Sequence, residues 1–204
     1  MSDAELTFWT RAPFVFWSFV FFVFGSVVGS FLNVCIYRMP RDLSLAKPGS
    51  QCPKCDFAIP WRLNIPIMSW LWLHGRCRQC AAPISPRYLT VELLTGLAFL
   101  ASWLVFGAQT TPEVLLAVTW GAVLAGLIAA TFIDFEHFII PDQITLGGVA
   151  FGFIVSAALP ALHHAGRPAD SLMSSGLGIL IGAGSVFAVL QLGKLLFGRL
   201  RVPL

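Results

Sequence analysis

The strongest constraint on the fold of this chain is a series of long apolar runs, each nearly free of charged residues. A helix needs about 20 apolar residues to cross the roughly 30 Å hydrocarbon core of a bilayer. Runs that reach or approach this length lie at residues 13–37, 88–106, 114–133, 144–162 and 172–197. Only 11% of the residues are charged, against roughly 25% in a soluble domain. The sequence therefore predicts an all-α polytopic membrane protein with about five transmembrane helices.

The predicted spans divide the chain into three parts. Residues 1–37 form an N-terminal segment with the first helix, residues 38–87 form a loop domain, and residues 88–204 form a transmembrane helical domain. The first run is too long for a removable signal sequence, and it lacks both a preceding basic cluster and a small-residue cleavage site. We therefore expect it to remain in the mature protein.

The distribution of basic residues predicts the orientation of the helices. Eight of the thirteen lysines and arginines lie in residues 38–87, and basic residues in short loops stay on the cytoplasmic side. We therefore expect an external N-terminus, an internal C-terminus, and a cytoplasmic position for both the loop domain and residues 134–142. The net charge of +3 is too small and too localised for a nucleic-acid-binding face.

Four of the five cysteines lie in the loop domain as two C-x-x-C pairs, Cys52 with Cys55 and Cys77 with Cys80. Two such pairs can supply the tetrahedral thiolate shell of structural zinc. Two disulfides or four free thiols are the alternatives, and a reducing cytoplasm argues against the disulfides. We expect Cys35 to be a packing residue. The sequence leaves open whether the loop only caps two helices or also helps to select a protein substrate.

The segment between the third and fourth predicted spans, residues 134–142, carries three acidic groups and a proline, which predicts a turn at the membrane surface. Asp134 directly follows an apolar run. Ionisable groups at membrane depth are costly, and partial desolvation would raise the pKa of a carboxyl group there. Asp134 is therefore a candidate for proton exchange, and the simpler reading is that it marks the end of a helix.

Four motifs in this order together resemble the bacterial prepilin leader peptidases. They are GSVVGSFLNVCIYRMPR from Gly25, the paired C-x-x-C knuckles, SPRYLTVELLTG from Ser85, and FIDFEHFIIPDQIT from Phe132. They cover most of residues 25–145.

The resemblance implies an intramembrane aspartyl endopeptidase of the bacterial inner membrane. Such an enzyme removes the basic leader of type IV prepilins and type II secretion pseudopilins at the cytoplasmic face. Many members also methylate the new N-terminus with S-adenosylmethionine, for which no binding residues can be named here. The resemblance assigns the first catalytic aspartate to Asp134 and structural zinc to Cys52, Cys55, Cys77 and Cys80.

Aspartyl proteolysis needs two neighbouring carboxylates that share one proton, so Asp134 needs a partner. The family takes its second aspartate from a Gly-x-Gly-Asp motif, which these 204 residues lack. Asp142 lies in the same short segment as Asp134, and Asp170 lies in a loop predicted to be external, so neither is expected to complete the dyad. We favour a fragment of a longer protein. The alternatives are a partner chain that supplies the aspartate, or a catalytically incomplete scaffold whose zinc loop docks pilus or secretion components.

Overall fold

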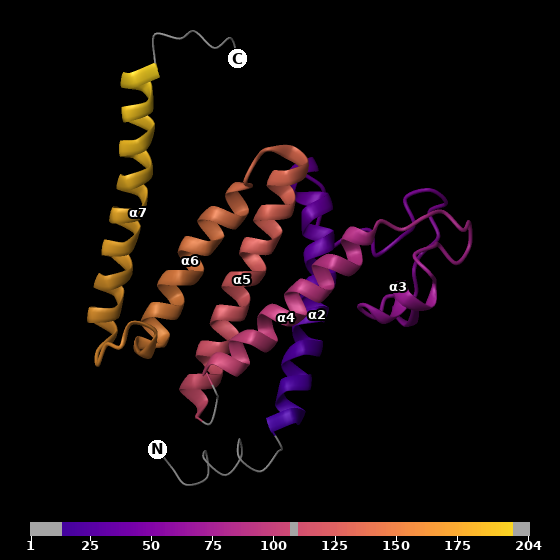
Figure 1. Cartoon of the computed structure of the whole chain (residues 1–204), viewed down its shortest axis with the longest axis horizontal. Helices are drawn as coiled ribbons and strands as arrows, with labels where there is room; N and C mark the ends of the chain where they lie inside the picture. The colour runs from indigo at the N-terminus through magenta and orange to yellow at the C-terminus, as the bar shows by residue number, and fades with distance from the viewer. Residues whose placement is uncertain (1–13, 107–109, 198–204) are drawn as a thin grey trace. The chain divides into compact units, whose positions relative to one another are not determined.

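The computed structural model describes residues 14–106 and 110–197, and this part of the chain is built from helices joined by loops (Figure 1). The long helices are α2 (Phe14–Arg38), α4 (Pro86–Phe106), α5 (Thr111–His137), α6 (Asp142–Ala158) and α7 (Pro168–Phe197). The shorter elements are η1 (Met39–Arg41), η2 (Trp61–Leu63), α3 (Met68–Trp72) and η3 (Pro160–His163). Extended pairing in the described residues is confined to two isolated bridges in the cysteine loop. The predicted all-α class is confirmed.

Four of the long helices are long and apolar enough to cross a membrane, namely α2, α4, α5 and α7. The fifth, α6, is apolar but has only 17 residues. That length is at the lower limit of about 17–25 residues for a spanning helix. The structure therefore has the features of a multi-pass membrane protein.

Signals in the sequence set the starts of two helices. Ser85 precedes α4, and its Oγ accepts a hydrogen bond from the backbone N–H of Arg87, while Pro86 occupies the first helical position. Thr110 and Glu113 form a capping box at the start of α5. Both arrangements satisfy backbone N–H groups that have no partner inside the helix.

The end of α5 differs from the sequence prediction of a turn over residues 134–142. The helix continues through Asp134 to His137, and only residues 138–141 leave the helical path before α6 begins. Phe138 ends α5 in the left-handed conformation, and its N–H donates to the Asp134 carbonyl at 2.8 Å. Asp, Phe, Glu and His are all compatible with a helix, whereas Pro141 cannot donate a backbone hydrogen bond. Asp134 is therefore a residue of the last helical turn.

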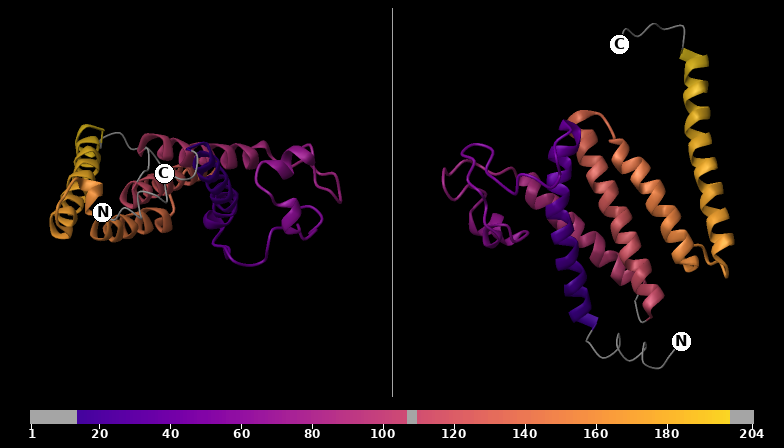
Figure 2. Two further views of the ribbon diagram at one scale, coloured as in Figure 1. Left: turned by 90° about the horizontal axis from the view of Figure 1, so that it is seen from below. Right: turned by 180° about the vertical axis from the view of Figure 1, so that it is seen from behind.

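The core of the described residues up to Gly148 lies among α2, α4 and α5, which pack against one another, with α4 running obliquely across the other two in Figure 1 (see also Figure 2). Close approach of α2 to α4 depends on glycine. A Cβ added at Gly29 would lie 2.8 Å from the Cα of Glu92, and one added at Gly25 would lie 2.7 Å from the Thr95 carbonyl oxygen. Small residues of this kind let membrane helices pack backbone to backbone.

Aromatic side chains fill the same core further along the helices. The Trp103 side chain is 1% exposed, and its ring stacks on that of Phe21 with 4.8 Å between centroids. Phe99 packs edge-to-face with Phe24 at 5.3 Å and lies against Gly121 of α5. These contacts make α2, α4 and α5 one packed unit, which carries the candidate site.

The chain from Val149 onward forms a second compact unit. Within it, Ser156 of α6 and Ser175 of α7 both lie within hydrogen-bonding distance of His163 Nε2, at 3.2 and 3.0 Å. Ser156 is 1% exposed, so this polar cluster is shielded where η3 joins the two helices. The cluster fastens the hairpin formed by α6 and α7.

Candidate functional site

The two cysteine pairs form knuckles with the same backbone geometry. In the first, Cys52 N–H donates to the Phe57 carbonyl and Asp56 N–H donates to the Cys52 carbonyl. In the second, Cys77 N–H donates to the Ala82 carbonyl and Ala81 N–H donates to the Cys77 carbonyl. The residue four positions after the first cysteine has a positive φ in each case, 54° at Asp56 and 56° at Ala81. The spacing of the cysteines therefore folds into one local structure twice.

The knuckles bring all four sulfurs to one point. Their Sγ atoms lie within 4.8 Å of one another, with 3.8 Å between Cys52 and Cys80 and 3.9 Å between Cys55 and Cys77. Tetrahedral zinc has Zn–S bonds of about 2.3 Å, which places its sulfurs about 3.8 Å apart. The predicted four-cysteine cluster is therefore confirmed as a group that fits a metal ion such as zinc. The four thiolates would fill its coordination shell, which suits a structural ion.

The four thiols differ in acidity. Backbone N–H groups of Cys80 and Gln79 lower the pKa of Cys77 to about 6. At Cys55 the backbone N–H of Phe57 acts in the same direction, but loss of hydration and the other three sulfurs outweigh it and raise the pKa of Cys55 to about 12. The lowered pKa of Cys77 favours its thiolate, which is the form that binds metal.

Residues near the cysteines play distinct structural parts. Trp70 lies over Gly75, which has a φ of 64°, and the indole N–H of Trp70 donates to the Ile84 carbonyl at 3.3 Å. Trp61 and Trp72 are instead 77% and 62% exposed. Trp70 thus belongs to the small core of the loop, whereas the other two tryptophans lie on its surface. Cys35 is buried in α2 away from the knuckles, as expected for a packing residue.

A buried carboxylate joins the cysteine loop to the helices. Glu92 of α4 is 8% exposed, and its Oε2 accepts a hydrogen bond from the backbone N–H of Ile67 at 2.7 Å. Ile67 immediately precedes α3 and has a φ of 64°, which is unusual for a β-branched residue. The sequence places Glu92 near the end of a span but gives no sign of this partner, because the partner is a backbone group.

Asp134 lies on the side of α5 that the core leaves uncovered. Every fourth residue of α5 is buried in the core: Ala117, Gly121, Ala125, Ala129 and Ile133. One residue further along a helix turns the side chain by about 100°. Asp134 is accordingly exposed, and its carboxylate makes no hydrogen bond or ion pair within residues 14–106 and 110–197. Protein atoms therefore do not bury this carboxylate, and its desolvation by lipid stays a prediction.

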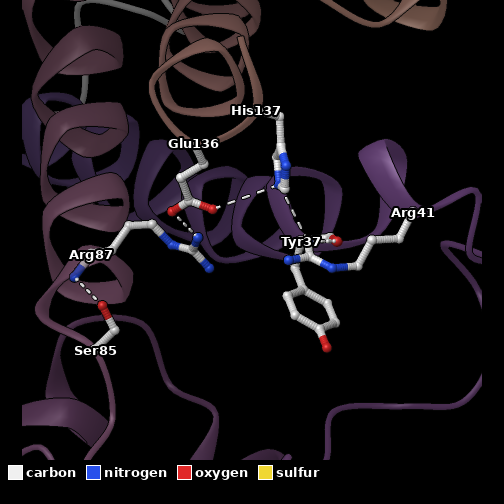
Figure 3. Close-up of polar contacts among 6 residues, drawn as sticks. All are labelled: Tyr37, Arg41, Ser85, Arg87, Glu136 and His137. Carbon is white, nitrogen blue, oxygen red and sulfur yellow. Dashed lines mark hydrogen bonds and ion pairs between the residues drawn. The ribbon is translucent and has the colours of Figure 1, made fainter. Parts of the chain in front are cut away.

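The next two polar residues of α5, Glu136 and His137, contact neighbouring elements (Figure 3). Glu136 accepts a hydrogen bond, as an ion pair, from Nη1 of Arg87 in the first turn of α4. His137 Nε2 lies 3.5 Å from Nη1 of Arg41, which also donates to the Tyr37 carbonyl at 2.6 Å. Sequence reasoning missed this network, because its members are 49 and 96 positions apart. The sequence carried one hint of this network, because residues of opposite charge occur at helix ends that were predicted to lie on the same, cytoplasmic, face of the membrane.

Comparison with known proteins places two segments of the chain in protein families. Residues 23–106 match the bacterial peptidase A24 N-terminal domain, and residues 121–199 match the type IV leader peptidase family. The first match contains the cysteine knuckles, and the second contains Asp134. No solved structure matches the chain.

Individual relatives carry related names. The chain is 40% identical over 195 residues to a prepilin leader peptidase/N-methyltransferase of Myxococcus xanthus (strain DK1622), covering 87% of this chain and 56% of the relative. It is 34% identical to the protein of the same name from Dichelobacter nodosus, covering 88% of this chain and 68% of the relative.

A third relative, from Escherichia coli O78:H11 (strain H10407 / ETEC), is named a type 4 prepilin-like proteins leader peptide-processing enzyme. It is 44% identical over 66% of this chain and 55% of its own length. The chain thus spans a little over half the length of the first relatives it matches. Together, the two family matches and the extent of the Dichelobacter similarity show that this chain belongs to the type IV leader peptidase family.

Proposed function

We propose that this protein acts in the removal of leader peptides from type IV prepilins and related pseudopilins, with Asp134 as one of two catalytic carboxylates. The observation that carries the proposal is the position of Asp134. It lies in the last turn of an apolar helix, and its carboxylate is unpartnered within the described residues, so it is free to meet a substrate. Family membership and the names of the relatives support leader peptides as the substrate class.

The reaction would be hydrolysis by an aspartyl mechanism. An ionised carboxylate takes a proton from water, and the water oxygen bonds to the scissile carbonyl carbon. A second, protonated carboxyl group stabilises the carbonyl oxygen, and the amide nitrogen receives a proton as the C–N bond breaks. Asp134 can take either role. The second carboxyl group is not assigned to a residue here, since no Gly-x-Gly-Asp occurs in the sequence.

The metal would support this chemistry only through structure. Cys52, Cys55, Cys77 and Cys80 would hold zinc, which would order the loop domain of residues 38–87. Methylation of the new N-terminus with S-adenosylmethionine is proposed on the names of the relatives alone.

The location proposed is the bacterial inner membrane, with the N-terminus outside and with the cysteine loop and Asp134 on the cytoplasmic side. Eight basic residues in the loop support this orientation. A reporter fused after Leu204 should be active only in the cytoplasm, and periplasmic activity would contradict the topology.

The catalytic assignment is tested with Asp134→Asn. Membranes that contain the wild-type protein should cleave a prepilin, and the variant should lose cleavage, because an amide can neither take nor give the proton. Mass spectrometry of the substrate measures the loss of the leader.

Asp142→Asn is the matched control, since it removes an exposed carboxylate eight residues away and should preserve cleavage. Cleavage by the Asp134 variant would overturn the role of that residue. A wild-type protein that is inserted in the membrane but does not cleave would instead favour the scaffold function.

A further inference from the structure

Two contacts join the last turn of α5 to two different neighbouring elements. Arg87 of α4 binds Glu136, and Arg41, at the end of η1, contacts His137. Figure 3 shows the two arginines approaching the end of α5 from separate elements. We call these four residues the α5 clamp. Asp134 lies in the same helical turn but makes no bond to the clamp.

The α5 turn needs such support for two reasons. The last carbonyl groups of a helix have no intrahelical partner, so the final turn frays easily. The C-terminal end of a helix also carries partial negative charge, which disfavours the nearby carboxylates of Asp134 and Glu136. Arg87 offsets this charge at Glu136, and the side chains of the pair are 16% and 36% exposed, so solvent screens the pair in part.

Arg41 is itself held in a fixed direction. Its guanidinium carbon lies 4.3 Å from the centre of the Tyr37 ring, and Nη1 donates to the Tyr37 carbonyl at 2.6 Å. The contact with His137 Nε2 at 3.5 Å therefore starts from a side chain already fastened to the end of α2. A neutral His137 with Nε2 unprotonated would accept from Arg41.

From these contacts we propose that Arg41, Arg87, Glu136 and His137 are positioning residues that fix the last turn of α5, and so fix the direction of the Asp134 carboxylate. The clamp holds the helical turn through the side chains of Glu136 and His137 and leaves the Asp134 carboxylate unbound. Its catalytic meaning rests on the proposed function, whereas its hold on the helix does not.

The first test measures the helix end without any substrate. In Glu136→Gln, hydrogen exchange at the Phe138 amide, which bonds to the Asp134 carbonyl, should speed up by about tenfold, since the charge pair is lost. The protein is measured in lipid nanodiscs by mass spectrometry of the peptide that covers the end of α5. Exchange at the wild-type rate would overturn the clamp.

The second test measures catalysis by the same variant. The kcat for prepilin cleavage should fall by about tenfold while KM stays unchanged, because a misdirected carboxylate affects the chemical step rather than substrate binding. Reversal of the pair, with Arg87→Glu and Glu136→Arg in one protein, should restore much of the lost kcat. Faster exchange with full kcat would show a purely structural pair and would refute positioning.

Asp42→Asn is the matched control. Asp42 is an exposed acid next to Arg41 that forms no ion pair within the described residues, and its left-handed backbone suits asparagine. This variant should exchange and cleave as the wild type does. A wild-type protein without cleavage would remove the proposed function and the catalytic meaning of the clamp, and the exchange rates would still decide whether the clamp holds α5.

Discussion

Glu92 is buried in a helix of the bundle, yet its carboxylate binds a backbone group of the cysteine loop. The distance of 2.7 Å from the Ile67 nitrogen to Glu92 Oε2 is within the normal range for an N–H···O hydrogen bond. Ile67 sits at a φ of 64°, a conformation that costs free energy for a β-branched residue and needs support from its surroundings. One side chain thus ties the loop to α4 and supports a strained turn.

Removal of this acceptor should loosen the loop. In Glu92→Ala the Ile67 N–H loses its partner, at a cost of about 1–3 kcal/mol for an unsatisfied buried donor. Limited trypsin digestion should then cut faster at Arg62 and Arg76 of the loop. Glu92→Gln keeps an oxygen acceptor in the same place and should resist digestion more nearly as the wild type does. Equal digestion of the alanine variant and the wild type would contradict the tie.

At the scale of elements, the α2–α4 contact is the closest packing in the described core. Gly29 faces backbone atoms of α4, with the Glu92 Cα at 2.8 Å and the Val91 carbonyl oxygen at 3.0 Å from an added Cβ. Backbone cannot move aside as a flexible side chain can. The two helices must therefore separate to accept even a methyl group.

Gly29→Ala should accordingly destabilise the protein by about 1–3 kcal/mol, which is the usual cost of overpacking. Gly126 provides the control, because a Cβ added there has nothing within 4 Å and the residue also lies inside a helix. Thermal unfolding in detergent, followed by circular dichroism, should show a lower midpoint for the Gly29 variant only. A similar midpoint in both variants would argue that the helices are not in backbone contact.

Helices were the elements that sequence could predict best. The predicted span at 13–37 differs from α2 by one residue at each end, and the span at 88–106 starts two residues after α4 begins and ends at the same residue. The predicted third span stopped at residue 133, four residues before α5 ends at His137. Loss of hydrophobicity marked where the chain leaves lipid, but a helix continues through polar residues until a left-handed residue or a proline stops it.

The candidate site was predictable where its members are close in sequence. The four cysteines were found from their spacing, since two C-x-x-C turns can form only a few local shapes. Asp134 was found by resemblance and by its place after an apolar run. The Arg87–Glu136 and Arg41–His137 contacts could not be found, because they depend on how α2, α4 and α5 pack.

For the molecule as a whole, the cysteine loop and the helical core are stabilised by different means. The core buries Phe99, Trp103 and Ile133 among three helices. The loop has short elements with few buried apolar side chains and centres on four sulfurs. Small domains of this kind commonly depend on a metal for folding.

Metal removal should therefore unfold the loop and leave the helices in place. Elemental analysis of the purified protein should find about one zinc per chain, and chelation should expose the loop to protease without loss of helical circular dichroism. Cys77→Ser should lose the metal, and Cys35→Ala, which changes a cysteine outside the cluster, should retain it. A metal-free protein with a protease-resistant loop would count against a zinc site.

The helices α6 and α7 differ in length, and neither length matches the thickness of a typical bilayer. At a rise of 1.5 Å per residue, the 17 residues of α6 extend about 25 Å and the 30 residues of α7 extend about 45 Å. A hydrocarbon layer of about 30 Å matches neither length, so a spanning α7 would tilt or carry its last turns among the headgroups, and a spanning α6 would draw the headgroups inward. Bilayer thickness should therefore act on these two helices in opposite directions, with thicker membranes favouring α7 and thinner membranes favouring α6.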